Sequence, residues 1–180
     1  MLQTIALSVA LSAGTMWNLD ASKSTVSYHL VHKLHQFTGT DHGHLDGKAL
    51  MKPDGTVQAQ VVGHVKDFDS ENSNRDEHMM ETVEAARFPN VSAKALVHFD
   101  PGQASGTQKA DAKVEMNLHG KNETKTVPVT LTYEGANRVH VTSDFDASVE
   151  GFGIQRPQLL FVPINDAMGI KLDLWFDRAQ

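Results

Sequence analysis

Hydrophobic and polar residues alternate along much of the chain. Between residues 110 and 118, each apolar side chain is followed by Asp, Lys, Glu or Asn. A period of two places the apolar side chains on one face of an extended segment, so we predict a half-buried β-strand here. The same period returns at 91–99, 127–133, 139–145 and 168–176. Alternation this persistent predicts an antiparallel sheet with one dry face.

Short turn signals separate the alternating segments and predict that neighbouring strands are joined as hairpins. They are Pro53-Asp54-Gly55, Pro101-Gly102, His119-Gly120-Lys121-Asn122 and Glu134-Gly135. A sheet of about eight antiparallel strands must protect its edges, and closure into a barrel removes them. We therefore predict an all-β protein built as an extended antiparallel barrel of about eight strands. A barrel of that size can hold one small apolar ligand.

One segment breaks this period and predicts a single helix over residues 74–86. It reads NRDEHMMETVEAA, with Ser73 as the expected N-cap, Asp76 at the capping-box position and Pro89 beyond the end. Met79 and Val83 share a stripe with Ala86, which predicts that the helix packs at or near an open end of the barrel.

The first fourteen residues form a separate feature. MLQTIALSVALSAG is apolar and small, as in the hydrophobic part of a secretory signal, but the usual positive start is absent. A signal-peptide remnant and a first strand therefore both stay open for 1–14. Residues 15–180 are expected to form one barrel domain. We expect no stable membrane span, because no other segment resembles a transmembrane helix.

Composition narrows the classes of function. The net charge is -6, and no basic run is interleaved with aromatic residues, so nucleic acid is not an expected partner. The absence of cysteine excludes thiol catalysis and thiolate metal sites. No Gly-x-Ser-x-Gly, His-Glu-x-x-His or phosphate-binding glycine loop occurs, so an enzyme is disfavoured. An unusual lyase or isomerase that uses His32 and Arg75 stays open.

Four histidines crowd the stretch HKLHQFTGTDHGH at 32–44. On a strand that starts at Val26, His32 would point into the barrel, and the favoured interpretation is a core histidine hydrogen-bonded to a neighbour. His42 and His44 would share a polar outer face, where two imidazoles two residues apart could hold one ion. A solvated pair is the favoured interpretation for them.

A metal site would need histidines that are distant in sequence. If the helix closes the barrel near the end of the strand before Gly120, His32, His78 and His119 could converge. Three imidazoles with an open fourth position would suit zinc or copper, and Glu81 could orient His78.

The predicted ligand-binding residues are those whose side chains the alternation directs inward, with Phe145 and Met79 near a mouth. They are Tyr28, Leu30, His32, Met79, Val114, Met116, Leu118, Val129, Leu131, Phe145 and Leu172. Periodicity leaves open the alternative of a solid core without a ligand.

Three stretches resemble the YceI-like family, and the resemblance covers nearly the whole chain from residue 17. They are the opening WNLD with Ser24-Thr25-Val26, the stretch SNRDEHMMETVEAARFPNVSAKA at 73–95, and Leu118-His119-Gly120 with Val127-Pro128-Val129. The resemblance implies a lipocalin-like barrel, export to the periplasm and an isoprenoid chain bound in the lumen. The chain is similar to a variant of the family with His-x-x-His at 32 and 35.

One function is expected for this chain, and two alternatives stay open. The expectation is a periplasmic lipid-binding protein that holds an amphipathic isoprenoid or quinone-like chain in an apolar barrel lumen. The first alternative is a histidine-based zinc or copper protein, and the second is a small stress-response enzyme that acts on an apolar substrate. A homodimer stays open as well.

Overall fold

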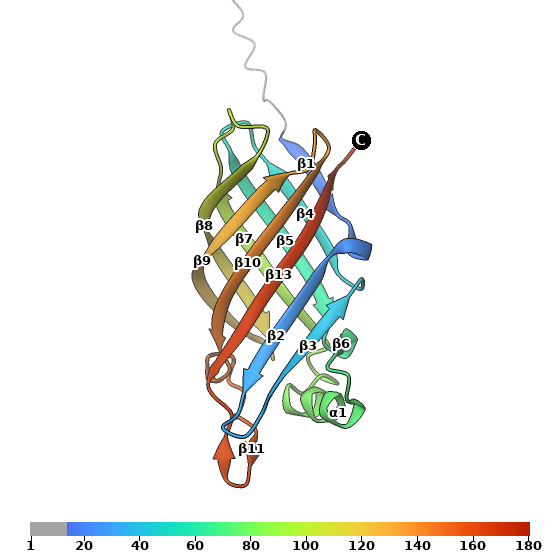
Figure 1. Ribbon diagram of the computed structural model, residues 1–180, viewed down its shortest axis with the longest axis vertical. Coiled ribbons are helices and arrows are strands. Elements are labelled where there is room, and N and C mark those ends of the chain that lie inside the picture. Colours follow the sequence, from blue (N-terminus) through green and yellow to red (C-terminus); the bar gives the residue numbers. More distant parts are fainter. Residues whose placement is uncertain (1–13) are drawn as a thin grey trace, which may run out of the picture.

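The computed structural model describes residues 14–180 and shows an elongated antiparallel barrel with one helix near its lower end (Figure 1). The strands of the main sheet are β1 (Thr15–Leu19), β2 (Thr25–Val31), β3 (Gln36–His42), β4 (Asp46–Met51), β5 (Thr56–His64), β6 (Phe68–Asp69), β7 (Asn90–His98), β8 (Thr107–Leu118), β9 (Lys121–Tyr133), β10 (Arg138–Ser148) and β13 (Ala167–Arg178). A separate hairpin joins β11 (Gln158–Leu159) to β12 (Val162–Pro163), and the helical segments are η1 (Ala21–Lys23), η2 (Val65–Asp67), α1 (Ser73–Thr82) and η3 (Glu150–Phe152).

The sheet closes on itself through the pairing of β1 with β13. The closed ring runs β1-β4-β5-β7-β8-β9-β10-β13, which is eight strands, and every pairing in it is antiparallel. β2 continues the line of β1 along β13, because Leu19 pairs with Phe176 and Thr25 pairs with Asp173. The predicted antiparallel barrel of about eight strands is therefore confirmed.

The wall is weakest beside β3. Thr40 and Asp41 pair with the two residues of β6, but the pairings within residues 14–180 give Gln36 to Gly39 no strand partner on that side. Helix α1 lies in this region, next to β3 and β6 (Figure 1). The prediction of one helix near an end of the barrel is thus confirmed. None of the helices within residues 14–180 is long and apolar enough to cross a bilayer.

The helix boundaries differ from the predicted ones. Asn72, rather than Ser73, is the N-cap, and its side chain accepts a hydrogen bond from the Arg75 amide at 3.1 Å. The helix ends at Thr82 instead of residue 86, because Glu84 adopts a left-handed φ of 50°. The amide of Ala85 then reaches back to the Met80 carbonyl at 2.8 Å, which closes the helix in a Schellman arrangement.

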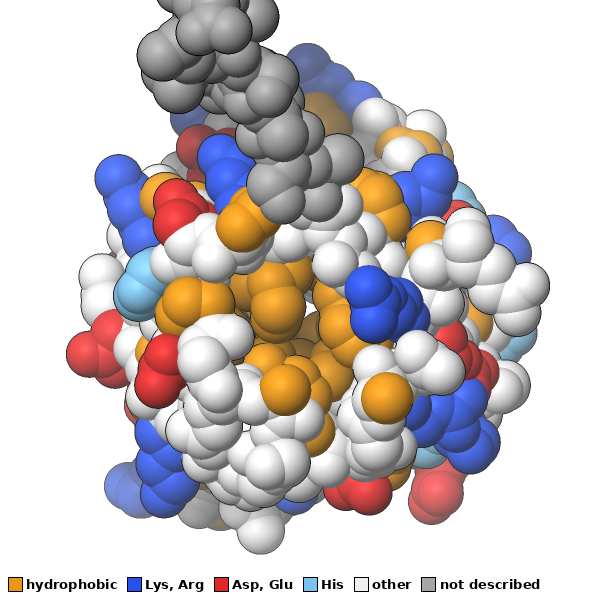
Figure 2. Space-filling model, turned by 90° about the horizontal axis from the view of Figure 1, so that it is seen from above, with side chains coloured by type: hydrophobic (Ala, Val, Ile, Leu, Met, Phe, Trp, Pro, Cys, Tyr) orange, Lys and Arg blue, Asp and Glu red, His pale blue; other side chains and the backbone are white. Residues whose placement is uncertain are grey.

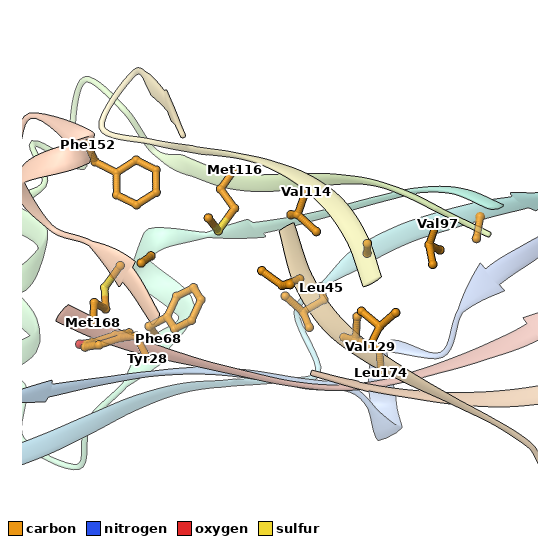
Figure 3. Close-up of a cluster of buried hydrophobic side chains, with 14 of the residues drawn as sticks. Tyr28, Leu45, Phe68, Val97, Val114, Met116, Val129, Phe152, Met168 and Leu174 are labelled. Atoms are coloured by element: carbon orange, nitrogen blue, oxygen red, sulfur yellow. The ribbon is translucent and has the colours of Figure 1, made fainter. Parts of the chain in front are cut away.

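The inward faces of the strands carry the predicted alternating apolar residues. Buried side chains from β2, β8, β9 and β13 meet others from irregular segments in the interior, and Figure 3 shows Tyr28, Phe68, Phe152 and Met168 toward one end of this cluster. Residues 1–13 lie outside the described part, so the two interpretations of the first fourteen residues keep the status of predictions.

Candidate functional site

The interior contains an apolar cavity of about 360 Å³. Its walls are formed by inward side chains of the barrel strands, with contributions from α1 and from the segments 149–157 and 164–168. Seen from the end opposite α1, the molecule is hollowed, and hydrophobic side chains surround the hollow (Figure 2). The barrel is therefore not a solid core.

Most of the predicted ligand-binding residues lie on the wall of this cavity. They are Tyr28, Leu30, Met79, Val114, Met116, Leu118, Val129, Leu131, Phe145 and Leu172. Figure 3 shows Tyr28, Val114, Met116 and Val129 in the same interior cluster, although they come from three different strands. The alternation of apolar and polar residues predicted the strand residues, because each of them lies within a regular strand. Met79 was predicted from the apolar stripe of the helix.

Sequence reasoning missed several wall residues. Phe68, Phe152 and Ile164 are buried and line the cavity, yet they lie in or beside short turns where no period applies. Trp17 also lines it and is 6% exposed. Trp17 stands in the WNLD stretch that carried the family resemblance, which was the one available signal for it.

The helix contributes three polar residues to the wall, namely Arg75, His78 and Thr82. Arg75 donates from Nε to Ser70 Oγ at 2.8 Å and from Nη2 to the Ser70 carbonyl at 2.6 Å, and its guanidinium lies 5.0 Å from the Phe37 ring. His78 lines the cavity and is also 80% exposed, so the cavity reaches the surface beside α1. Asp76 accepts a hydrogen bond from Ser70 Oγ at 2.5 Å, which fixes the loop before the helix.

Tyr28 is the buried polar residue next to this helix. Its ring crosses β3 at Gly39, where any Cβ would overlap it. Within the described part of the chain its hydroxyl has no hydrogen-bond partner. Burial, helped by the negative charge of Asp76, raises the pKa of Tyr28 to about 12, so the hydroxyl stays protonated at neutral pH. A neutral hydroxyl that can donate and accept is thus available at the helix end.

The structure corrects the prediction that His32 faces the lumen. β2 ends at Val31, and the His32 amide bonds to the His35 carbonyl at 2.8 Å to form the turn to β3. The ring is 4% exposed but is not part of the cavity wall. Nδ1 accepts from the Leu34 amide at 3.2 Å, so Nε2 carries the proton and donates to the Val162 carbonyl at 3.0 Å. His32 therefore connects the β2–β3 turn to the β11–β12 hairpin.

The three histidines suggested as metal ligands do not come together. Among the described side chains, His32, His78 and His119 do not form a group close enough to share an ion. His78 lies 3.4 Å from Glu81 on the exposed side of α1. The alternation could not reveal this, because all three residues lie outside or at the end of strands.

His119 instead connects the end of the helix segment to the barrel. Its Nδ1 lies 3.2 Å from the Phe152 carbonyl and its Nε2 lies 3.1 Å from Glu84 Oε1. The hydrogen bond from His119 holds the pKa of the Glu84 carboxyl below its usual range. The ring also packs edge-on against Phe88 at 5.1 Å. These contacts give His119 a structural role.

A closed eight-stranded antiparallel barrel with an apolar interior and one helix is a lipocalin-like fold. The model of the YceI-like domain matches residues 17–176, so the chain belongs to the YceI-like family. The predicted family is therefore confirmed. A comparison with curated proteins found no match.

Solved structures share this fold at low sequence identity. A polyisoprenoid binding domain from Saccharophagus degradans, implicated in plant cell wall breakdown, aligns with a TM-score of 0.74 and 17% identity over 91% of this chain and 98% of that one. BcnA from Burkholderia cenocepacia aligns with a TM-score of 0.73 and 19% identity over 87% and 98%. A YceI protein from Campylobacter jejuni aligns with a TM-score of 0.61 and 10% identity over 76% and 82%. These likenesses show the fold.

Proposed function

We propose that the barrel binds an amphipathic lipid, with an isoprenoid or quinone-like chain held in the lumen. The observation that carries the proposal is the apolar cavity of about 360 Å³, bounded by wall residues from nearly every strand. This volume is within the range of pockets that bind small molecules. The similar Saccharophagus degradans domain, described as polyisoprenoid binding, supports the same class of ligand.

Burial of the chain supplies enough free energy for retention. Each buried methylene contributes about 0.8 kcal/mol, so about ten carbons contribute about 8 kcal/mol before the cost of association. No charged partner is needed along the wall. The ligand class is therefore defined by its long apolar chain, and a catalytic group has no necessary part in this function.

The polar head group is assigned to the helix end. Tyr28 presents a buried hydroxyl without a partner in the described chain, and Arg75 presents a positive charge on the cavity wall. Exposed His78 marks a polar route to solvent beside α1. A quinone carbonyl or an oxygen-bearing isoprenoid terminus would accept hydrogen bonds from these donors.

Action in the periplasm is part of the proposal. Its support is the apolar, small-residue pattern of residues 1–14, which resembles the hydrophobic part of an export signal. The direct check is fractionation of cells that express the full chain, with recovery of the protein in the periplasmic fraction as the expected result. Recovery only with cytoplasmic markers would contradict this part.

Two tryptophans give an internal test of lumen binding. Trp17 lines the cavity, whereas Trp175 lies outside it, stacked on His140 at 4.2 Å. In the Trp175→Phe variant, titration with a short-chain ubiquinone should quench the fluorescence of Trp17 in a saturable way. In the Trp17→Phe variant the remaining tryptophan should respond weakly. Equal quenching in both variants, or none in either, would contradict binding inside the barrel.

A further inference from the structure

Asp41, His44 and Asp67 form a cluster outside the lipid cavity. Their potential ligand atoms all lie within 4.8 Å of one another. Asp41 is near the end of β3, where Gly43, with a φ of 90°, turns the chain so that His44 returns over Asp41. Asp67 ends η2, and the pairing of Asp41 with Phe68 places it alongside. The turn at Gly43 and the end of η2 thus bring the three side chains together.

The buried carboxylate of Asp41 is incompletely satisfied. Its side chain has no exposed surface, and Oδ1 accepts a hydrogen bond from the His44 amide at 3.0 Å. Oδ2 is buried and has no hydrogen-bond partner within residues 14–180. A buried carboxylate oxygen without a donor is costly unless a cation or a donor compensates it.

The distances fit a small divalent cation after modest movement. Zinc bonds of about 2.0–2.1 Å in a tetrahedral site place neighbouring ligand atoms about 3.3 Å apart. Asp41 Oδ1 and His44 Nδ1 are already 3.5 Å apart. The His44 side chain is 61% exposed, so its ring is free to rotate toward the ion. The ligand atom of Asp67 lies within 4.8 Å of those of Asp41 and His44.

The charges around the cluster also favour a cation. Two carboxylates and one imidazole form a mixed oxygen and nitrogen set, which suits zinc with an open fourth position. The nearby competing cation is Lys66, whose Nζ lies 3.2 Å from Asp67 Oδ1. Its side chain is 73% exposed and can turn into solvent.

We propose that Asp41, His44 and Asp67 form a binding site for a divalent transition-metal ion, with zinc as the best match. The site is separate from the lipid cavity, because none of the three residues belongs to its wall. A bound ion would join the β3–β4 connection to η2, beside the weakest part of the barrel wall. Because the ion would bind the folded protein and not the unfolded chain, the melting temperature should rise as the zinc concentration is raised.

The test uses the full-length protein without a histidine tag, stripped with a chelator and titrated with zinc chloride by calorimetry. The variants are His44→Ala and Asp67→Asn, which change ligands at the edge of the fold. The matched control is His42→Ala, because His42 is exposed on the same strand end but is not part of the cluster. Melting temperatures with and without zinc provide the second measurement.

The expected result is one equivalent of zinc bound by the unaltered protein and by His42→Ala. His44→Ala and Asp67→Asn should each bind at least about 100-fold more weakly, and zinc should no longer raise their melting temperatures. The absence of saturable zinc binding would overturn the proposal. An equal loss of zinc affinity in His42→Ala and His44→Ala would overturn it as well. Zinc would then be bound by the ten histidines of the chain in general and not by this site.

Discussion

The two ends of the barrel are built from the same strands but differ in the polar groups that they offer to a ligand. At the end opposite α1, buried Gln108 is satisfied by the protein, since its side chain accepts from the Asp100 amide at 2.8 Å and donates to the Gln103 carbonyl at 3.1 Å. At the helix end, the buried Tyr28 hydroxyl has no partner in residues 14–180, and the charged Arg75 lies on the cavity wall.

This difference favours one orientation of the proposed amphipathic ligand. The end opposite α1 offers the indole N–H of Trp17, which is also buried without a partner in the described region. The helix end offers a hydroxyl, a guanidinium and a polar route past His78. The charged and hydrogen-bonding groups therefore favour a position of the head group near α1, with the apolar chain extending toward the opposite end of the barrel.

The largest expected effect is a loss of ligand affinity when the lumen is blocked by a larger side chain. Leu131 is 3% exposed and lines the cavity, so Leu131→Trp places a larger side chain where the proposed ligand chain would lie. We expect ubiquinone affinity to fall by at least about 100-fold, which corresponds to about 3 kcal/mol. The measurement is a binding titration by native mass spectrometry. The control is Leu96→Trp, the same change at a side chain that is 47% exposed outside the cavity. Unchanged affinity in Leu131→Trp would contradict the assignment of the lumen.

The next effect is a loss of stability in alkali that depends on Tyr28. Its pKa rises from 10.0 to about 12 in the folded protein, mainly through burial. The unfolded chain therefore loses the phenolic proton at lower pH than the folded one. The stabilisation is complete below pH 10 and is lost as the pH rises toward 12, by about 2–3 kcal/mol.

Urea unfolding at several pH values would measure this loss, and Tyr28→Phe should remove about that much of the pH dependence. Tyr133→Phe is the matched control. The chain has only two tyrosines, so in Tyr133→Phe the phenolate absorbance reports Tyr28 alone. Titration of this absorbance near pH 10 would contradict the buried state of the hydroxyl.

A smaller effect is expected from loosening the helix. Arg75→Ala removes two hydrogen bonds to Ser70 and the contact with the Phe37 ring. The free energy of unfolding should fall by about 1–2 kcal/mol, and ubiquinone should dissociate faster because α1 covers the weak part of the wall. Arg87→Ala is the control, since Arg87 also lies over an aromatic ring but is 74% exposed. Identical dissociation rates for the two variants would argue against a special role of Arg75.

The smallest effect is expected at His78. Its side chain is 80% exposed, and its contact with Glu81 at 3.4 Å is solvated. His78→Ala should change the free energy of unfolding by less than about 0.5 kcal/mol. Zinc affinity should also stay unchanged. A large loss of zinc affinity in this variant would indicate that the zinc ligand is on the helix and not in the proposed cluster.

The regular part of the fold was predictable from sequence because a strand directs every second side chain inward. Val114, Met116, Val129 and Leu131 were all placed on the cavity wall by that rule alone. The rule failed at His32, because β2 stops one residue earlier and the backbone turns. A single-residue change at a strand end is enough to move a side chain off the interior face.

The clusters formed by irregular segments were not predictable. Asp41 and Asp67 meet only because β3 pairs with the short strand β6, and this pairing has no signal in the hydrophobic pattern. His119 likewise meets Glu84 through a turn at a left-handed backbone position, with a φ of 52°. Contacts between turns depend on how the barrel closes, which local patterns do not specify.

Native mass spectrometry of the untagged protein, before and after organic extraction, tests the central claim most directly. We expect the purified protein, or the extracted protein incubated with ubiquinone, to carry one apolar molecule that organic solvent removes. We expect the Leu131→Trp variant to carry none. A mass equal to the bare chain under both conditions, or equal occupancy in Leu131→Trp, would contradict a lipid held in the lumen.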